Sequence, residues 1–302
     1  MTPALKVRGR TLPLGRRPVL MGIVNATPDS FSDAGLYATL EERVELAASL
    51  VAQGAAIIDV GGQSGVTNRP EVDPDEEISR VVALVERIAG AHDVVVSVDT
   101  YKPAVARAAL DAGASIVNDV SGLRFPEVAE ACGRAGAGLV IMHNRSAPKQ
   151  RLTDPALYED VVADVTGFLE EKLAAAREAG VAQDATILDP GPDFSKTPAQ
   201  TIEVLRHLDR VHALGRPVLL AVSRKDFIGA LTDRPPRSRL AGTLAAVGFV
   251  RRWPGQILRV HDVAAVADFL VTAEALEGDR EVPADLELRA DLRREDSRGL
   301  TP

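Results

Sequence analysis

The sequence predicts an α/β fold, a single-domain (β/α)8 barrel of the TIM type. The chain has 302 residues, 46% of them hydrophobic, and short apolar runs alternate eight times with stretches of helical periodicity. Eight strand-then-helix units are the number that closes a barrel of ~250 residues. Polar residues also stand at or just past the end of each apolar run. That is the edge of a barrel where enzymes place their chemistry.

The first strand and the loop after it set this pattern. Val19, Leu20, Ile23 and Val24 lead directly into Asn25 and then into a polar stretch that runs to about residue 39. A short apolar run bounded by turn residues is typical of a buried parallel strand. Long loops without periodicity are usually functional. The sequence therefore predicts an enzyme whose first strand opens onto an active-site loop.

Seven further strands and eight helices follow the same alternation. We expect the strands at 56–60, 94–99, 115–119, 138–143, 185–189, 218–222 and 257–260. We expect the helices at 41–53, 76–88, 103–112, 126–134, 154–179, 199–213, 237–251 and 263–276. The predicted organisation is a basic lead-in at 1–17, the barrel at 18–276 and a charged tail at 277–302. The tail has few large apolar residues, so we expect it to be flexible.

Composition excludes several classes of function. The formal net charge of −8 argues against general nucleic-acid binding, although a local basic cluster can hold an anionic substrate. The single cysteine, Cys132, excludes an internal disulfide and a site with several thiolate ligands. No apolar run reaches ~18 residues, and the N-terminus lacks the apolar core of a signal peptide. We expect a cytoplasmic protein without membrane or nucleic-acid partners.

Polar residues at the predicted strand ends should share one pocket, because barrel strands converge on one mouth. One aspartate there is more often a helix cap, but eight polar residues in succession favour a binding site. They are Asn25, Asp59, Asp99, Asn118, His143, Asp189, Ser223 and His261. Asp99, Asn118 and Asp189 suit a flat heterocycle with N–H donors. Lys225 is placed to donate to the carbonyl or ring nitrogen of that heterocycle.

Cations gather near the last two strands, the usual phosphate-binding side of such barrels. Arg224 and Lys225 follow the seventh strand, and Arg259 and His261 flank the end of the eighth. Arginine suits phosphate because it donates paired hydrogen bonds, and cations at a helix start otherwise oppose the helix dipole. Asn25 is either a turn residue or one oxygen ligand of Mg2+, with a diphosphate and waters completing the octahedron.

Seven segments together resemble the dihydropteroate synthase family of the folate pathway, over about residues 18–276. In order they are MGIVNATPDSFSDAG, IIDVGGQS, VSVDTYKPAVARAALDAGASIVNDVSG, LVIMH, ILDPGPDFSKTP, SRKDFIG and LRVHDV. The resemblance implies a (β/α)8 homodimer, a target of sulfonamides, that binds Mg2+. It implies that the diphosphate ester of 6-hydroxymethyl-7,8-dihydropterin is joined to p-aminobenzoate with loss of diphosphate.

The resemblance also implies tasks for individual residues. The pterin edge would be held by Asp99, Asn118, Asp189 and Lys225, with Asp59 and Met142 nearby. Asn25 would ligate Mg2+, and the leaving diphosphate would be surrounded by Arg259, His261 and Asn25. The aminobenzoate would be bordered by Phe194, Arg69, Pro70 and Lys225. Ionisation of the C–O bond before attack suits this set. Acidic residues would stabilise the pterin cation, while Arg, His and Mg2+ would stabilise the departing anion.

Three departures from the family lie on the acceptor side. The second loop reads GGQSGVTNRPEV where the family has GGESTRPG, and DPGPDFSK stands where the family has DPGIGFGK. Asp226 follows SRK where a serine or basic residue is common, near the expected aminobenzoate carboxylate. Two anions ~4 Å apart repel by about 1–4 kcal/mol, depending on the local dielectric.

These departures leave two other interpretations open. One is a divergent paralogue that keeps the pterin site but is weak or inactive with p-aminobenzoate, either because it uses another acceptor or because it is a non-catalytic pterin-binding subunit. The other is a pterin-binding methyltransferase domain of the cobalamin-dependent type. That type shares the barrel and the pterin edge but needs no diphosphate site, so Arg259, His261 and the SRK segment argue against it.

Overall fold

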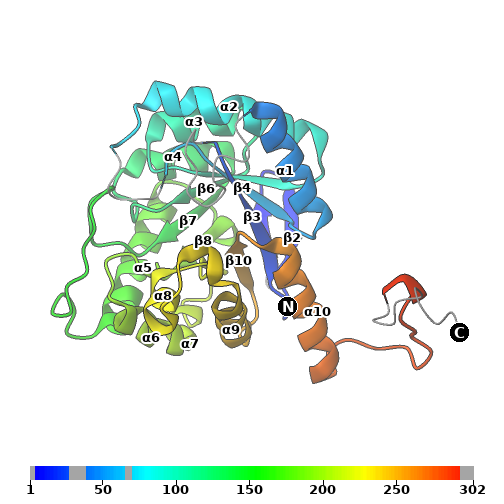
Figure 1. The fold of residues 1–302 in the computed structure, drawn as a ribbon. Helices are drawn as coiled ribbons and strands as arrows, with labels where there is room; N and C mark the ends of the chain where they lie inside the picture. The colour runs from blue at the N-terminus through cyan, green and yellow to red at the C-terminus, as the bar shows by residue number, and fades with distance from the viewer. Residues whose placement is uncertain (1–3, 27–38, 65–69, 293–302) are drawn as a thin grey trace, which may run out of the picture. The chain divides into compact units, whose positions relative to one another are not determined.

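Eight parallel strands close into the barrel that the sequence predicts (Figure 1). The computed structural model describes residues 4–26, 39–64 and 70–292. The predicted active-site loop at 27–38 lies outside the described residues. Around the barrel the strands are β10 (Gln256–Val260), β3 (Val19–Asn25), β4 (Ile57–Gly61), β5 (Val95–Asp99), β6 (Ile116–Asp119), β7 (Gly138–Met142), β8 (Thr186–Asp189) and β9 (Val218–Leu220). Each lies within two residues of its predicted position.

The register of the strands brings the polar residues to the same end of the barrel. Asn25 pairs with Gly61, Gly61 with Asp99, and Asp99 with Asn118 across neighbouring strands. On the other side of the barrel Met142 pairs with Asp189. Because the strands run parallel, these residues form one ring at the carboxyl edge.

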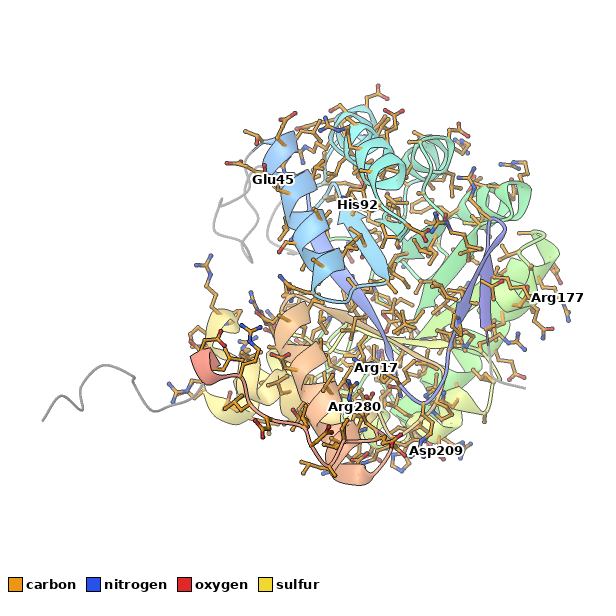
Figure 2. All side chains as sticks on the ribbon, turned by 90° about the vertical axis from the view of Figure 1, so that its right-hand side faces the viewer. Arg17, Glu45, His92, Arg177, Asp209 and Arg280 are labelled. Atoms are coloured by element: carbon orange, nitrogen blue, oxygen red, sulfur yellow. The ribbon has the colours of Figure 1, made fainter. Side chains whose placement is uncertain are left out.

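Helices lie around the barrel strands (Figure 1). They are α1 (Leu40–Ala52), α2 (Pro74–Ala91), α3 (Pro103–Asp111), α4 (Pro126–Ala135), α5 (Val161–Glu178), α6 (Pro198–Arg206), α7 (Leu208–His212), α8 (Asp226–Thr232) and α9 (Leu240–Val250). The last helix, α10 (Val263–Glu277), follows β10 in the chain. Local signals start several of them. Thr39 and Glu42 form a capping box at α1. Charged side chains such as Glu45 and Arg177 point outward (Figure 2).

Three helix predictions were wrong in detail. The helix expected from residue 154 starts at Val161, because Asp154 accepts a hydrogen bond from the Ala156 amide in a local turn and Asp160 caps α5 instead. The helix expected at 199–213 is split at His207, whose φ of −111° and ψ of 34° are not helical. The helix start considered at Arg224 and Lys225 is that of the short helix α8, for which no range was predicted, and α9 starts three residues later than expected.

The predicted lead-in contains a β-hairpin, β1 (Ala4–Val7) and β2 (Arg10–Pro13). Arg8 and Gly9 turn it with φ of 46° and 76°, as a two-residue hairpin turn with left-handed residues requires. Leu5 and Val7 are buried. A Cβ on Gly138, at the amino end of β7, would lie only 2.7 Å from the Val7 side chain. The hairpin therefore packs on the barrel end opposite the polar ring.

The chain divides into two compact units, residues 1–267 and 268–302. The second unit contains the end of α10 and a single 3-10 turn at Ala290–Leu292. Leu286 and Leu288 in it are exposed. No helix within the described ranges has the length and apolar character needed to cross a lipid bilayer.

Candidate active site

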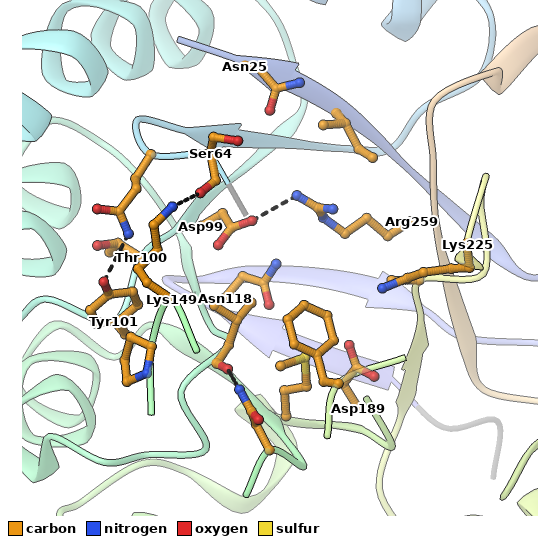
Figure 3. A pocket seen from close by; sticks show the side chains of 18 of the residues that line it. Asn25, Ser64, Asp99, Thr100, Tyr101, Asn118, Lys149, Asp189, Lys225 and Arg259 are labelled. Carbon is orange, nitrogen blue, oxygen red and sulfur yellow. Dashed lines mark hydrogen bonds and ion pairs between the residues drawn. The ribbon is translucent and has the colours of Figure 1, made fainter. Parts of the chain in front are cut away.

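A pocket of about 430 Å³ opens at the carboxyl ends of the strands (Figure 3). Six of the eight predicted strand-end residues line it: Asn25, Asp99, Asn118, Asp189, Ser223 and His261. Met142, Phe194, Arg224, Lys225 and Arg259, also predicted from sequence, line it too. The volume is in the range of pockets that hold small organic ligands.

Arg259 organises the floor of the pocket. Its Nε donates to Oδ2 of Asp59 at 2.6 Å, and its Nη2 donates to Oδ2 of Asp99 at 2.9 Å (Figure 3). Asn118 donates from Nδ2 to the same oxygen of Asp59 at 3.1 Å. Asp59 is fully buried behind these two residues. It positions Arg259 and Asn118 without lining the pocket itself.

Several polar atoms in this cluster lack a hydrogen-bond partner among the described residues. Among the described residues, Oδ1 of Asn118 and Oδ1 of Asp59 are buried without a hydrogen-bond partner. The Nη1 group of Arg259 likewise has no acceptor in the described part of the chain. Leaving a buried polar group unpaired costs about 1–3 kcal/mol. A ligand in the pocket that pairs with Oδ1 of Asn118 or with Nη1 of Arg259 recovers that cost, because both residues line the pocket.

The two aspartates at the pocket wall hold their protons more tightly than usual. Burial raises the pKa of Asp99 to about 7, although the neighbouring Arg259 opposes the shift. Burial also raises the pKa of Asp189 to about 6, while a hydrogen bond from the Gly191 amide at 2.7 Å opposes it. Perturbed carboxyl groups in one pocket are typical of functional sites.

Lys225 lies on the opposite wall from Asp99. Its Nζ lies 4.5 Å from the centre of the Phe194 ring, a cation–π contact. Removal from water lowers the pKa of Lys225, and Asp193 and Asp189 oppose the shift. Within the described residues its ammonium group has no hydrogen-bond acceptor, so its donors can serve a ligand in the pocket.

Two of the residues predicted to bind phosphate, Arg224 after β9 and His261 after β10, have protein partners. Nδ1 of His261 lies 3.0 Å from Oγ of Ser223. Arg224 makes two hydrogen bonds to Asp262, from Nε at 3.1 Å and from Nη2 at 2.7 Å. Arg224 therefore lines the pocket with its guanidinium fixed on a carboxylate, whereas Nη1 of Arg259 has no acceptor among the residues that the structure describes.

His143 does not share the pocket, which corrects the prediction that all eight strand-end residues do. Its Nε2 lies 2.8 Å from Asp164 of α5, and Nζ of Lys196 lies 2.7 Å from its Nδ1. Successive residues of a strand point to opposite faces. Met142 faces the pocket, so His143 faces the helices. Burial lowers the pKa of His143 to about 3.

The acceptor-side residues are placed less centrally. Asp226 is outside the pocket lining and is paired with Arg239 at 3.0 Å and Arg151 at 3.7 Å. Pro70 is exposed and does not line the pocket either. Arg69 lies outside the described residues.

Sequence reasoning missed a polar network at the root of the second loop. Gln63 donates to the hydroxyl of Tyr101 at 2.9 Å, and that hydroxyl donates to Glu71 at 2.9 Å. Lys102 reaches Glu77 at 2.8 Å and Oε1 of Gln63 at 3.1 Å. Gln63, Glu77 and Tyr101 line the pocket. Gln63 and Glu71, which stand where the family segment has glutamate and glycine, were the available signal, because both join this network.

The segment after β7 was also missed. Asn144, Ser146 and Lys149 line the pocket, and Nζ of Lys149 donates to the carbonyl of Ser64 at 2.7 Å (Figure 3). The polar run that follows His143 was the available signal. It places a basic side chain against the root of the second loop.

Asn25 is compatible with a bound Mg2+. It lines the pocket at the end of β3, and its neighbour Gly61 has no side chain. A Cβ at Gly61 would lie 3.8 Å from Oδ1 of Asn25 and 3.7 Å from the Cβ of Asp99. Mg2+ commonly takes one or two protein oxygens and completes its shell with substrate phosphates and water. The residues present fit that type of site.

The chain is similar in sequence and in fold to known proteins. Residues 21–261 match the family described as pterin binding enzyme. The chain is 40% identical over 278 residues to a dihydropteroate synthase of Synechocystis, covering 91% of this chain and 95% of that protein. The Xanthomonas albilineans dihydropteroate synthase with 4-aminobenzoic acid has 41% identity and a TM-score of 0.84 over 94% of this chain and 100% of that one. The Yersinia pestis enzyme with a sulfonamide drug has 36% identity and a TM-score of 0.85, over 91% and 99%.

Proposed function

This chain belongs to the pterin-binding enzyme family, and from that premise we propose that it is a dihydropteroate synthase. It condenses the diphosphate ester of 6-hydroxymethyl-7,8-dihydropterin with p-aminobenzoate to give 7,8-dihydropteroate and diphosphate, a step of folate biosynthesis. The observation that carries the proposal is a single pocket with two chemical edges. One edge is acidic and amide-bearing, and the other is cationic.

The acidic edge would bind the pterin. Asp99 and Asp189 accept hydrogen bonds from ring and amino N–H groups, and the unpaired Oδ1 of Asn118 accepts another. Lys225 donates to the carbonyl or a ring nitrogen. A flat heterocycle bound this way pairs every polar edge atom, which a buried site requires.

The cationic edge would bind the diphosphate. Arg259 keeps its bonds to Asp59 and Asp99 and offers the Nη1 donors to the phosphate oxygens. His261 adds a donor at the end of β10. The C–O bond breaks and its electron pair leaves with the diphosphate, so a positive charge forms on the pterin methylene. The carboxylates stabilise that cation, and the cationic edge stabilises the anion.

We further propose that Asn25 ligates Mg2+ together with the diphosphate and water. The ion would supply charge neutralisation of the leaving group. The family is consistent with a metal-dependent transferase. Asn25 lies beside Gly61, where no side chain fills the space next to its amide oxygen.

The acceptor would enter beside Phe194 and Lys225. An arylamine is a weak nucleophile, so attack on the methylene cation after ionisation is the order that the residues support. The amine nitrogen forms the new C–N bond and loses one proton to water. A related enzyme has been solved with 4-aminobenzoic acid and another with a sulfonamide drug. We propose that this pocket also takes both.

We also propose a homodimer in the cytoplasm. Helix α9 has the sequence LAGTLAAVGFV, which contains no charged residue, and only Thr243, Val247 and Val250 in it are buried. Leu240 at its start is 37% exposed. Apolar surface of this kind is typical of subunit interfaces. Light scattering of the native chain and of a Leu244→Glu variant tests the dimer, because the variant should shift the mass toward the monomer.

The direct test of the proposed function is diphosphate release from the pterin diphosphate with Mg2+, with and without p-aminobenzoate. We expect release that depends on the arylamine and forms dihydropteroate in equal amount. Asp189→Asn should lower this activity at least about tenfold, because an amide N–H would face the ligand's donors. Tight pterin binding without arylamine-dependent release would refute the synthase and favour the paralogue.

A further inference from the structure

The loop after β8 has an unusual backbone. Gly191, Asp193 and Ser195 have φ of 65°, 65° and 51°, so every second residue from 191 to 195 is left-handed. Glycine adopts this conformation freely, whereas other residues do so at a cost. Strained residues persist where their surroundings hold them. Asp193 and Ser195 therefore need compensating contacts, and both have them.

Asp193 joins this loop to the start of α8. Its Oδ2 accepts hydrogen bonds from the amides of Asp226 at 2.6 Å and Phe227 at 3.3 Å. Thr201 of α6 donates to its Oδ1 at 3.2 Å and accepts from its amide at 3.0 Å. A side chain at position 193 thus bridges β8's loop, α6 and α8, which a glycine there does not do.

Ser195 joins the same loop to the segment after β7. Its Oγ donates to Oδ1 of Asn144 at 2.7 Å and accepts from the amides of Arg145 at 3.2 Å and Ser146 at 2.9 Å. Its carbonyl accepts from the hydroxyl of Tyr158 at 2.8 Å. Ser195 is buried, so these bonds are shielded from water.

Phe194 lies between these two anchored residues. Its ring lines the pocket 4.5 Å from Nζ of Lys225, the residue just before the amides that Asp193 holds. Asp193 therefore fixes the two partners of the cation–π contact relative to each other. Ser195 fixes the other side of Phe194 against Asn144 and Ser146, which also line the pocket.

We propose that Asp193 and Ser195 are positioning residues that preorganise Phe194 and Lys225 for the acceptor. The proposal rests on the proposed function, because it concerns the second substrate of that reaction. Neither side chain lines the pocket. Each acts by replacing the freedom of a glycine with hydrogen bonds to a neighbouring loop, which lowers the ordering that acceptor binding must impose.

The test compares glycine and conservative variants. Asp193→Gly and Ser195→Gly relieve the left-handed strain and remove the bridges, whereas Asp193→Asn keeps an acceptor oxygen at the same place. The matched control is Asp233→Gly. Asp233 is also left-handed, with φ of 52°, but it is exposed at the end of α8.

Two readouts separate positioning from general stability. In amide hydrogen exchange, Asp193→Gly should speed exchange at the amides of Asp226 and Phe227 about tenfold or more, because each loses about one net hydrogen bond. Ser195→Gly should speed exchange at the amides of Arg145 and Ser146 by a similar factor. In kinetics the double glycine variant should raise the KM for p-aminobenzoate about tenfold, the order expected when one or two more residues must be ordered. Its kcat and its KM for the pterin diphosphate should change less than about threefold.

Asp193→Asn should leave the amide exchange rates at Asp226 and Phe227 and the KM for p-aminobenzoate close to the native values. Asp233→Gly should change neither the exchange rates nor the KM. Unchanged exchange in the glycine variants, or faster exchange with an unchanged KM for p-aminobenzoate, would overturn the proposal. So would an equal rise in KM for Asp233→Gly. A native enzyme that forms no dihydropteroate would refute the proposed function, and the exchange experiment would still decide whether the two side chains hold the loop.

Discussion

Replacing Arg259 with Met tests how the pocket floor is built. The change removes the donors to Asp59 and Asp99 while leaving a side chain of similar length. In the native chain these bonds are 2.6 and 2.9 Å long, Asp59 is fully buried, and the Arg259 side chain is 19% exposed. The variant leaves two carboxyl groups next to each other without their shared cation.

The expected loss of stability depends on pH. Removing one partner of a buried ion pair lowers the unfolding free energy by about 3–5 kcal/mol. Because Arg259 is partly exposed, we expect a loss of about 3 kcal/mol for Arg259→Met. The pKa of Asp99 is about 7 even beside Arg259, and loss of the cation raises it further. The folded variant then binds more protons than the unfolded chain. Its unfolding free energy therefore falls as pH rises from about 4 through 7 and above.

Urea unfolding at pH 8 and pH 5.5 measures both effects. We expect a loss of about 3 kcal/mol at pH 8 and about 1 kcal/mol at pH 5.5, where protonation removes the uncompensated charge. Arg224→Met is the matched control. Its partner Asp262 is 26% exposed, so about 1 kcal/mol or less should be lost at either pH. An equal loss for Arg259→Met at both pH values would refute this account of the floor.

Three further outcomes follow from the pocket. The affinity for 6-hydroxymethylpterin, measured by fluorescence titration, should weaken by up to about tenfold per pH unit below pH 7. The reason is that the pKa of Asp99 is about 7 and only its carboxylate form accepts hydrogen bonds from the ligand's N–H groups. Asp99→Asn should make the affinity less dependent on pH. Asn25→Leu should raise the half-saturating Mg2+ concentration about tenfold in the diphosphate assay, and an unchanged Mg2+ requirement would remove Asn25 as a ligand. Asp226→Ser should change the KM for p-aminobenzoate less than about threefold, because Arg239 and Arg151 already balance its charge; a tenfold drop would show that Asp226 repels the acceptor.

The barrel could be predicted from sequence because its signals are local. Eight apolar runs followed by polar strand-end residues specify the strands and their common edge, and all eight strands lie where expected. The helix errors have a local cause of another kind. Asp154 and Pro155 are typical of a helix start, yet Asp154 caps only a turn. His207 carries no breaker signal, so the sequence does not show that the helix is split there.

The site was predicted less completely because side-chain direction depends on pairing that sequence does not state. His143 and Asp189 both stand at strand ends, but His143 faces α5 and Asp189 faces the pocket. Arg224 and Arg259 have the same side chain, and only the fold distinguishes them. It brings Asp262 to Arg224, whereas Nη1 of Arg259 has no acceptor among the described residues. Asp193 and Ser195 gave a signal as departures from the family's glycines, but their contacts cross three loops.

The claim that the two edges of the pocket have separate tasks is tested most directly by binding the two halves of the substrate separately. We would measure the affinities of 6-hydroxymethylpterin and of Mg2+-diphosphate for the native chain, Asp189→Asn and His261→Ala by calorimetry. Asp189→Asn should weaken pterin binding about tenfold or more and leave diphosphate binding within about twofold, and His261→Ala should do the reverse. If both variants weaken both ligands equally, or if neither variant affects either ligand, the assignment of the acidic edge to pterin and the cationic edge to diphosphate is wrong.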